Sequence, residues 1–323
     1  MTEGPSYLSV AAASTGRETA GTIAPVKIMV LGAGAIGSVY GFKLSARHDV
    51  TLVGNAAHMR AIEQHGLRVE GAIVAGTFPL RAVTSVEHLE PGTLIILATK
   101  ASSSVDAITP IVPLLTPSVT ILCVQNGLYS ERLVSDLVGD RAVTLRAITQ
   151  VGSVLREPGV IEHTVLGHTL VEAHERAGAV AATLTECGLG GRVIPDMKVA
   201  MWRKVVFNCV INPITAITGS TVGGIVDLKL APIKRLVIDE CLAVAAADGV
   251  TFDADFMTLI DEVFASAATV ASTLQDLQKG RRTEIDHLNG AVVALGKHYG
   301  IPCPVNAALT TIIKQLEAQA RRG

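Results

Sequence analysis

Residues 26–37 read VKIMVLGAGAIG, and this segment is the strongest indication of the fold class. Its first half, Val26–Leu31, is a short apolar run typical of a buried parallel strand. Its second half matches G-x-G-x-x-G, in which Gly32 permits a tight turn, Gly34 lets a pyrophosphate approach the backbone, and Gly37 allows close helix packing. A helical segment follows, and its N-terminus suits a phosphate. The stretch therefore predicts a dinucleotide-binding unit, with a purely structural glycine turn as the alternative.

The choice between NAD and NADP should depend on the tip of the second strand, Asp49–Val53. A carboxylate at this tip would bind the adenosine 2′-hydroxyl, and a basic residue would receive the 2′-phosphate. The tip reads Gly54-Asn55, which offers neither. Without a repelling carboxylate the sequence favours NADP(H), does not exclude NAD(H), and leaves Arg60, His58 or Arg47 to supply compensating charge. The candidate cofactor contacts of this region are Gly32, Ala33, Gly34, Ala35, Ile36, Gly37 and Asn55.

Two further buried strands end in polar residues. Thr93–Thr99 is followed by Lys100, and Ser118–Val124 is followed by Gln125-Asn126-Gly127. Ligands of open parallel sheets bind beyond the carboxyl ends of the strands, so Lys100 and Asn126 should both lie on the cofactor edge. The structural alternatives are a solvated loop lysine and a left-handed turn residue before glycine.

The second half of the chain has a different pattern of predicted secondary structure. Shorter β-like stretches around 142–155 and 160–171, with a helix near 176–187, should extend the sheet at its edge. Beyond about Asp196, helical periodicities replace strand-like runs. The predicted helices of this half are 198–217, 231–248, 252–268, 284–299 and 304–321.

Three segments follow from these patterns. Residues 1–24 are predicted to be a flexible extension, because they are rich in small and polar residues and lack the basic start and apolar core of a secretory signal. Residues 25–195 should form a Rossmann-like dinucleotide-binding domain, and residues 196–323 a helical substrate and catalytic domain. A cleft between two such domains is a favoured position for a small-molecule site.

A polar row interrupts the hydrophobic helical run Met201–Pro213. Lys204, Asn208 and Asn212 are spaced by four residues, so each is rotated by about 40° from the last and all three project to one side. Buried amides and ammonium groups are costly when they lack partners, so something polar should meet this row. The row is either one wall of an active site or part of a core helix whose polar groups bond neighbouring backbone.

A second polar cluster lies within Ala271–Gly290. Glu284 and Asp286 would occupy the first turn of a helix that begins after Arg282 or Thr283, where acidic side chains suit the helix dipole. This dipole effect is a sufficient structural explanation of Glu284, and a role as an active-site acid is the alternative.

Composition narrows the class of partner. Lys and Arg number 27 against 29 Asp and Glu, which gives no electrostatic case for nucleic acid or for an anionic membrane. The five cysteines are single and lack the close pairs of a zinc site or redox dithiol, so we expect buried free thiols, no metal and a reducing, cytoplasmic compartment. No apolar run approaches the roughly 18 residues of a membrane span. A small molecule is the expected partner.

Five motifs occur in a characteristic order. They are Gly32–Gly37, Thr99-Lys100-Ala101, Gln125-Asn126-Gly127, Trp202-Arg203-Lys204 with Asn208–Pro213, and Arg282–Asp286 with Asn289-Gly290. From Val26 to the C-terminus the chain thereby resembles the ketopantoate reductases (2-dehydropantoate 2-reductases), and the last two motifs are the specific ones. The resemblance implies an α/β Rossmann-type dinucleotide-binding domain followed by an all-α C-terminal domain similar to that of 6-phosphogluconate dehydrogenase.

The same resemblance implies a reaction and roles for residues. The reaction is hydride transfer from NADPH to the keto carbon of 2-dehydropantoate, which gives (R)-pantoate on the route to pantothenate and coenzyme A. Lys204 looks like the residue that hydrogen-bonds the keto oxygen and donates the proton, and Glu284 resembles the acid that orients this lysine and the substrate. The implied substrate contacts are Asn208, Asn212 and Ser272. The implied contacts at the cofactor edge are Lys100 and Asn126, with Asn126 near the nicotinamide ribose.

Two departures from the family pattern bear on specificity. The family usually has arginine where this chain has Asn55, and many members have a substrate-contacting asparagine where this chain has Thr269. Relatives of this fold reduce other 2-keto acids, so a D-2-hydroxyacid dehydrogenase or 2-keto acid reductase that uses NADH is the second interpretation. A non-catalytic NADP-binding sensor is an alternative of another class. The expected partner of the enzymes is a small-molecule 2-keto acid, and a homodimer is a candidate assembly.

Overall fold

The computed structural model describes residues 24–322, which form two compact units. One unit comprises residues 24–125 and 129–197, and the other comprises residues 126–128 and 198–322. All but the last residue of the predicted N-terminal extension lies outside the described residues. Within the described part of the chain, no helix combines the length and apolarity that a membrane crossing requires.

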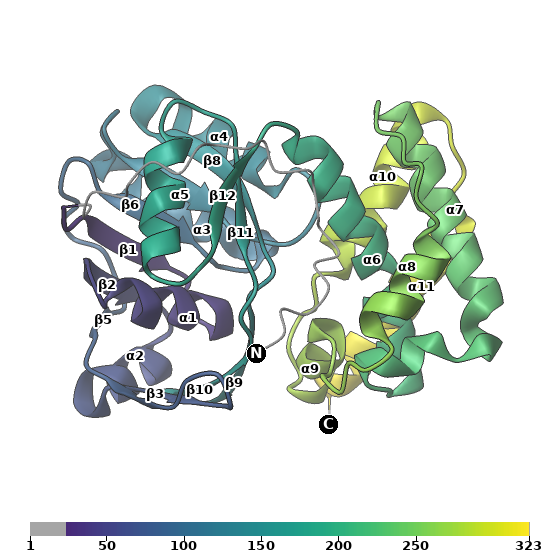
Figure 1. Cartoon of the computed structure of the whole chain (residues 1–323), viewed down its shortest axis with the longest axis horizontal. Helices are drawn as coiled ribbons and strands as arrows, with labels where there is room; N and C mark the ends of the chain where they lie inside the picture. Colours follow the sequence, from purple (N-terminus) through teal and green to yellow (C-terminus); the bar gives the residue numbers. More distant parts are fainter. Residues whose placement is uncertain (1–23, 323) are drawn as a thin grey trace. The chain divides into compact units, whose positions relative to one another are not determined.

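The first unit contains an eight-stranded sheet with the order β12-β11-β8-β7-β6-β1-β2-β5 (Figure 1). The chain winds outward from β1 in both directions, and β11 pairs antiparallel with β8 while the other neighbours pair in parallel. This arrangement confirms the predicted Rossmann-type fold class. The strands are β1 (Lys27–Leu31), β2 (Asp49–Val53), β5 (Arg81–Val83), β6 (Leu94–Leu97), β7 (Thr120–Cys123), β8 (Val143–Thr149), β11 (Thr169–Glu172) and β12 (Gly191–Ile194).

Both faces of this sheet are buried because its central strands are largely apolar. Ile28 and Val30 of β1 join one hydrophobic cluster, which also includes residues of α1 and α5. Met29 and Leu31, which point to the opposite face, join a second cluster with residues of α3 and α4. The helices of this unit are α1 (Ala35–Leu44), α2 (Ala56–His65), α3 (Ser104–Ile108), α4 (Ser130–Val138) and α5 (Ala177–Glu186).

A smaller sheet of order β4-β3-β10-β9 is separate from the main one. Its strands are β3 (Leu67–Glu70), β4 (Gly76–Phe78), β9 (Gly152–Glu157) and β10 (Val160–Val165). The prediction that residues 142–155 and 160–171 extend the main sheet is therefore right for β8 and β11 and wrong for β9 and β10. The reason for β9 lies in burial: it has no fully buried residue, whereas a strand inside a doubly covered sheet must be apolar on both faces. β10 has three buried residues and pairs with β9 and β3 instead of the main sheet.

The second unit is helical, as the sequence predicts. Two helices are shorter than expected: Asp255 caps the start of α8 by accepting a hydrogen bond from the Met257 amide, and α10 begins at Asn289 rather than Glu284. Leu288, with φ −108° and ψ −100°, separates α10 from a single 3₁₀ turn at Ile285–His287. The helices are α6 (Met197–Thr218), α7 (Ala231–Ala247), α8 (Phe256–Phe264), α9 (Ser272–Gln278), α10 (Asn289–Tyr299) and α11 (Pro304–Ala320).

Helix α6 is the most deeply embedded helix of this unit. Trp202 is fully buried, and its indole Nε1 donates a hydrogen bond to Asp248 Oδ2 at 2.8 Å. The ring of Phe207 packs against Phe256 and Phe264 at centroid distances of 5.6 and 5.8 Å. Burial of these large aromatic rings fixes the rotation of α6 about its axis, and with it the direction of the polar row.

We predict different stabilities for alanine at the first two motif glycines. Gly32 has φ +96°, and a Cβ there would lie 2.4 Å from the Thr99 amide nitrogen, so Gly32→Ala should lower the free energy of unfolding by about 2–4 kcal/mol. Gly34 has φ −93°, and a Cβ there would meet nothing within 4 Å, so the stability of Gly34→Ala should stay near that of the parent. Denaturant unfolding of both variants measures the difference, and equal stabilities would contradict the strained geometry assigned to Gly32.

Candidate active site

The glycine turn binds the ends of three neighbouring strands together. The amides of Gly32 and Ala33 both donate to the Val53 carbonyl at 2.9 Å, which holds the tip of β2 against the turn. Thr99, just beyond β6, packs on the other side of Gly32. Gly37 lies so close to the Gly32 carbonyl that a Cβ would come within 2.4 Å of its oxygen. The space beside the Gly34 Cα is open at the N-terminus of α1, so a phosphate could approach the turn there, although the Gly34 amide itself donates to the Gly32 carbonyl at 2.7 Å.

Asn55 has a structural role at the tip of β2. Its Oδ1 accepts a hydrogen bond from the His58 amide at 3.0 Å and so caps the N-terminus of α2. The side chain is exposed, and the neighbouring Gly54 lies against the Ala33 carbonyl. The structure thus places Asn55 next to the glycine turn and explains an asparagine at this position without a ligand.

Two of the three cations expected to read a 2′-phosphate are poorly suited to that role. His58 is buried, its Nε2 lies 3.0 Å from Ser38 Oγ and its Nδ1 accepts from the Gly159 amide at 2.8 Å, and burial lowers its pKa. It is therefore a neutral core residue. Arg47 precedes β2 and lies at its amino end, whereas Asn55 follows the carboxyl end. The expectation that His58 or Arg47 compensates for the missing arginine is thus not supported by their surroundings.

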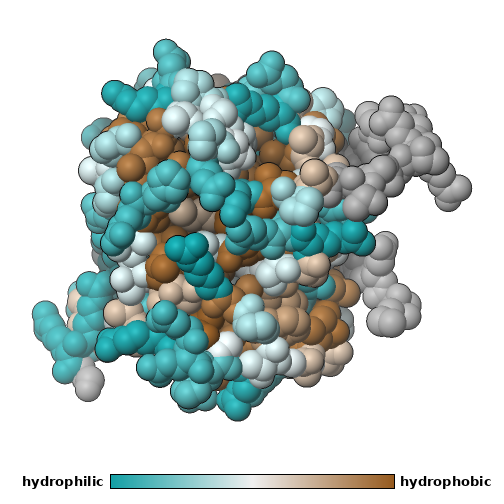
Figure 2. Space-filling model, turned by 90° about the vertical axis from the view of Figure 1, so that its left-hand side faces the viewer, coloured by the Kyte–Doolittle hydropathy of each residue, from teal (hydrophilic) through white to brown (hydrophobic). Residues whose placement is uncertain are grey.

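Arg60 remains as an exposed cation on α2 close to the strand tip. It lines a hollow of about 420 Å³ together with Ala56 of α2 and residues that follow β5, among them Thr84 and Ser85. Figure 2 shows a face of the α/β unit on which hydrophilic residues are spread with hydrophobic residues between them. Glu63 and Glu87 line the same hollow, so the guanidinium of Arg60 stands there beside two carboxylates, and the charge of the lining does not by itself select a phosphate.

The ends of β6 and β7 are joined by Gln125, a residue to which the sequence patterns assigned no role. Gln125 is 4% exposed, and its Nε2 donates to Thr99 Oγ1 at 3.1 Å and to Ser104 Oγ. Ser104 in turn donates to the Ala101 carbonyl at 2.9 Å. The amide thereby fixes the segment that carries Lys100, which is half-buried. The signal in the sequence was its place immediately after a buried strand and next to Asn126.

The polar row of α6 is present as predicted on one long helix. Lys204 is 9% exposed and Asn212 is 5% exposed, whereas Asn208 between them is half-buried. Burial of an ammonium group and an amide on one stripe of a hydrophobic helix is costly unless they meet other polar groups. The row therefore has the character of the wall of a polar site.

Residues 126–128 belong to the helical unit and bring a predicted cofactor residue to a predicted acid. Asn126 Nδ2 donates to Glu284 Oε2 at 3.1 Å, and the Leu128 amide donates to the His287 carbonyl at 3.4 Å. Gly127, with φ +96°, fits against His287, where a Cβ would come within 2.6 Å of the carbonyl oxygen. Glu284 is half-buried and lies outside any α-helix, so the explanation of this residue by a helix dipole is wrong.

Ser272 is the first residue of α9, and its side chain is exposed. Thr269 precedes this helix, and its carbonyl accepts a hydrogen bond from the Val222 amide at 2.8 Å. Both residues therefore lie at or before the start of α9, in a part of the helical unit separate in sequence from the α6 row.

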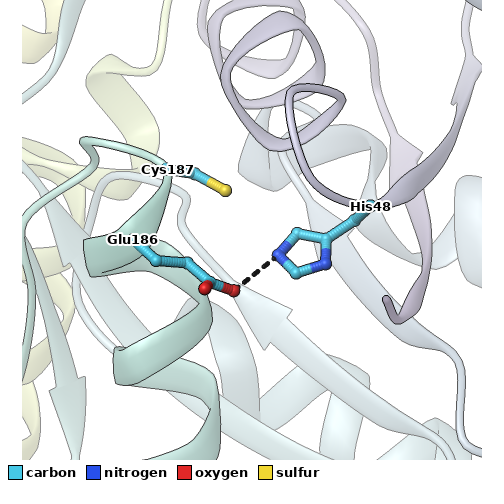
Figure 3. A group of neighbouring side chains, drawn as sticks. All are labelled: His48, Glu186 and Cys187. Atoms are coloured by element: carbon cyan, nitrogen blue, oxygen red, sulfur yellow. Dashed lines mark ion pairs between the residues drawn. The ribbon is translucent and has the colours of Figure 1, made fainter. Parts of the chain in front are cut away.

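A group of potential metal ligands lies elsewhere in the α/β unit (Figure 3). His48 Nε2 lies 3.1 Å from Glu186 Oε1, and Cys187 Sγ is close by. The Val26 amide donates to His48 Nδ1 at 3.3 Å, which leaves Nε2 to face Glu186 Oε1 in a contact that lacks hydrogen-bond geometry. Burial raises the pKa of the Cys187 thiol to about 11. The group brings the residue before β2 into contact with the end of α5, and its protonated thiol is a poor metal ligand.

Known proteins resemble this chain over most of its length. The family model described as ketopantoate reductase PanE/ApbA matches residues 28–176, and the model of its C-terminal part matches residues 196–317. A 2-dehydropantoate 2-reductase of Pyrococcus horikoshii is 34% identical over 301 residues, which cover 91% of this chain and 98% of the relative.

Solved structures agree with these matches. A PanE/ApbA family ketopantoate reductase from Ralstonia eutropha has a TM-score of 0.85 at 30% identity and covers 92% of this chain and 100% of its own. The ternary structure of D-mandelate dehydrogenase with NADH and anilino(oxo)acetate also has a TM-score of 0.85, at 25% identity, and covers 91% of this chain and 99% of its own. Because the two family models together span both units, the chain belongs to the ketopantoate reductase family of oxidoreductases.

Proposed function

We propose that this protein catalyses the NADPH-dependent reduction of 2-dehydropantoate to (R)-pantoate, a step toward pantothenate and coenzyme A. The observation that carries the proposal is the polar row of Lys204, Asn208 and Asn212 on α6, in which Lys204 and Asn212 are buried and Asn208 is half-buried. A reductase of a keto acid needs a proton donor at the carbonyl oxygen and neutral polar groups for the remaining oxygens, and this row supplies both kinds.

The glycine turn fits a dinucleotide. The space beside the Gly34 Cα is open at the N-terminus of α1, and amides at a helix N-terminus attract a pyrophosphate. Gln125 holds the segment of Lys100 in place at the same edge of the sheet. The nicotinamide cofactor supplies the hydride when it is bound.

Lys204 is proposed as the general acid of the reaction. As negative charge develops on the keto oxygen, the ammonium group hydrogen-bonds that oxygen and then gives it a proton from Nζ. Asn208 and Asn212, on successive turns of α6, bind the hydroxyl and carboxylate of the substrate, with Ser272 as a further contact. Low exposure of Lys204 excludes competing water and strengthens the interaction with the developing charge.

Glu284 is proposed to orient Lys204 and the substrate. Its Oε2 accepts from Asn126 Nδ2, so the amide fixes the carboxylate and is itself fixed in return. This hydrogen bond couples the residue after β7 with the substrate-binding groups of the helical unit. Asn126, predicted to contact the cofactor, is thus proposed to serve both the cofactor and the acid.

The second candidate is reduction of another 2-keto acid with NADH. The similarity to D-mandelate dehydrogenase favours it, as do Asn55 and Thr269, which depart from the family pattern. The buried free cysteines of the described residues, Cys123, Cys187, Cys209, Cys241 and Cys303, suit a reducing compartment, and we propose the cytoplasm as the location and a homodimer as the assembly.

Steady-state rates with a panel of substrates test the proposal. We expect kcat/KM to be highest for 2-dehydropantoate with NADPH, and lower for 2-ketoisovalerate and phenylglyoxylate with either cofactor. Fast turnover on phenylglyoxylate alone would assign the chain to the second candidate. Binding of NADPH with no oxidation across the panel would instead support a cofactor sensor.

Lys204→Ala should lower kcat by about 10²- to 10⁴-fold, because the developing alkoxide loses its proton donor. Binding of NADPH, measured by fluorescence titration, should stay near that of the parent. Lys234→Ala is the matched control, since Lys234 is 1% exposed on α7 and pairs with Asp261 at 2.6 Å. A Lys204 variant no slower than this control would remove Lys204 from the acid role.

Asn55→Arg should tighten NADPH binding with little effect on NADH, because it adds a cation at the strand tip. The substitution also removes the cap of α2, so Asn55→Ala serves as its control and should cost about 1 kcal/mol of stability without changing cofactor preference. Arg60→Ala should weaken NADPH binding selectively if Arg60 reads the phosphate. An unchanged NADPH/NADH affinity ratio in the arginine variant would place the phosphate elsewhere.

A further inference from the structure

Helix α6 contains a proline downstream of the polar row. Pro213 is buried within the helix and has no N–H, so the carbonyl four residues earlier, that of Cys209, has no intrahelical donor in the α-helical pattern. Cys209 is 0% exposed, which keeps water from this carbonyl. An unpaired carbonyl at this depth is costly, and the surrounding structure must supply a donor.

Asn289 supplies that donor from another helix. Its side chain is 0% exposed at the first residue of α10, and its Nδ2 donates to the Cys209 carbonyl at 3.0 Å. The second hydrogen of the same amide goes to Asn306 Oδ1 at 2.9 Å. Asn289 Oδ1 has no hydrogen-bond partner among the described residues, so the residue keeps an unsatisfied oxygen in the core. An apolar residue would avoid that cost, which indicates that the two donated hydrogen bonds are what the position requires.

A carboxylate fixes the direction of this chain of amides. Glu240 of α7 accepts from the amides of Val305 and Asn306 at 2.8 and 2.9 Å, and from Asn306 Nδ2 at 2.7 Å. Because a carboxylate only accepts, Asn306 must turn its Nδ2 toward Glu240 and its Oδ1 toward Asn289. Asn289 must then present its NH₂ group to Asn306 and to Cys209. The hydrogen bonds thus run from α6 through α10 and α11 to α7.

We propose that Asn289 is a positioning residue for the reductase site, acting through the Cys209 carbonyl on the polar row of α6. Cys209 adjoins Asn208, and Asn212 directly precedes the proline, a position where steric contact with the proline ring disfavours helical backbone. The hydrogen bond from Asn289 to the Cys209 carbonyl, here called the tether, therefore holds the segment of α6 that carries Asn208 and Asn212, the two residues proposed to bind substrate. The inference rests on the proposed function for its catalytic consequence, whereas the tether can be tested without it.

A double-mutant cycle with Asn289→Ala and Pro213→Ala tests the proposal, because alanine at 213 restores the missing N–H. We expect Asn289→Ala to lower kcat/KM for the keto acid by about tenfold to a hundredfold, chiefly through KM, with NADPH affinity unchanged. Pro213→Ala alone should stay near the parent, since a carbonyl can accept two hydrogen bonds. The double variant should recover most of the loss. A double variant as impaired as Asn289→Ala would overturn the proposal.

Leu309→Ala provides the matched control for stability. Leu309 is 3% exposed on α11 and takes no part in the amide chain, so its truncation destabilises the same unit without touching the tether. At a temperature where all variants are folded, Asn289→Ala must raise KM more than Leu309→Ala does. An equal rise in KM would show that Asn289 contributes only to the stability of the unit. If the parent reduces no keto acid, the proposed function fails; recovery of the melting temperature of Asn289→Ala by Pro213→Ala would still establish the tether.

Discussion

The α/β unit depends on the contact between the Gly32 turn and the strands beside it. Two amides of the turn share the Val53 carbonyl, and Thr99 fills the space that any side chain at position 32 would need. This contact fixes the carboxyl ends of β1, β2 and β6 at one edge of the sheet. The residues of this unit that are proposed to bind the cofactor, among them Gly34 and Lys100, lie at that edge.

The helical unit depends on contacts that hold its central helix, α6, in place. Its central helix, α6, must carry polar groups on one side and accommodate a proline, and both features would destabilise an isolated helix. Aromatic packing around Phe207 and the hydrogen bond of Trp202 hold the helix in place, and the Asn289 amide satisfies the carbonyl that the proline leaves. Asn289 on α10, Asn306 on α11 and Glu240 on α7 form the hydrogen-bond chain that supports α6.

A hydrogen bond from Asn126 to Glu284 links the residue predicted at the cofactor edge to the residue predicted as the acid. Residues 126–128 follow β7 in sequence but belong to the helical unit, so the edge of the sheet continues directly into the segment that contacts the acid. Under the proposed function the two residues serve one reaction, because a reductase needs a hydride donor and a proton donor at the same carbonyl.

Periodic and local features could be predicted from the amino-acid sequence. The Rossmann-type fold, the helical second half, the family and the placement of Lys204, Asn208 and Asn212 on one helix all follow from patterns that span neighbouring residues, and all four are confirmed. The roles of the site residues remain predictions. The hydrogen-bond partners of residues far apart in the chain, in contrast, became known from the folded structure.

Packing removed β9 and β10 from the main sheet, made His58 a neutral core residue, and gave Asn55 a capping role. It also joined Asn289 to the carbonyl freed by Pro213, although the two residues are far apart in the chain. Hydrogen bonds between such residues depend on how helices and strands pack, and side-chain periodicity carries no information about that packing.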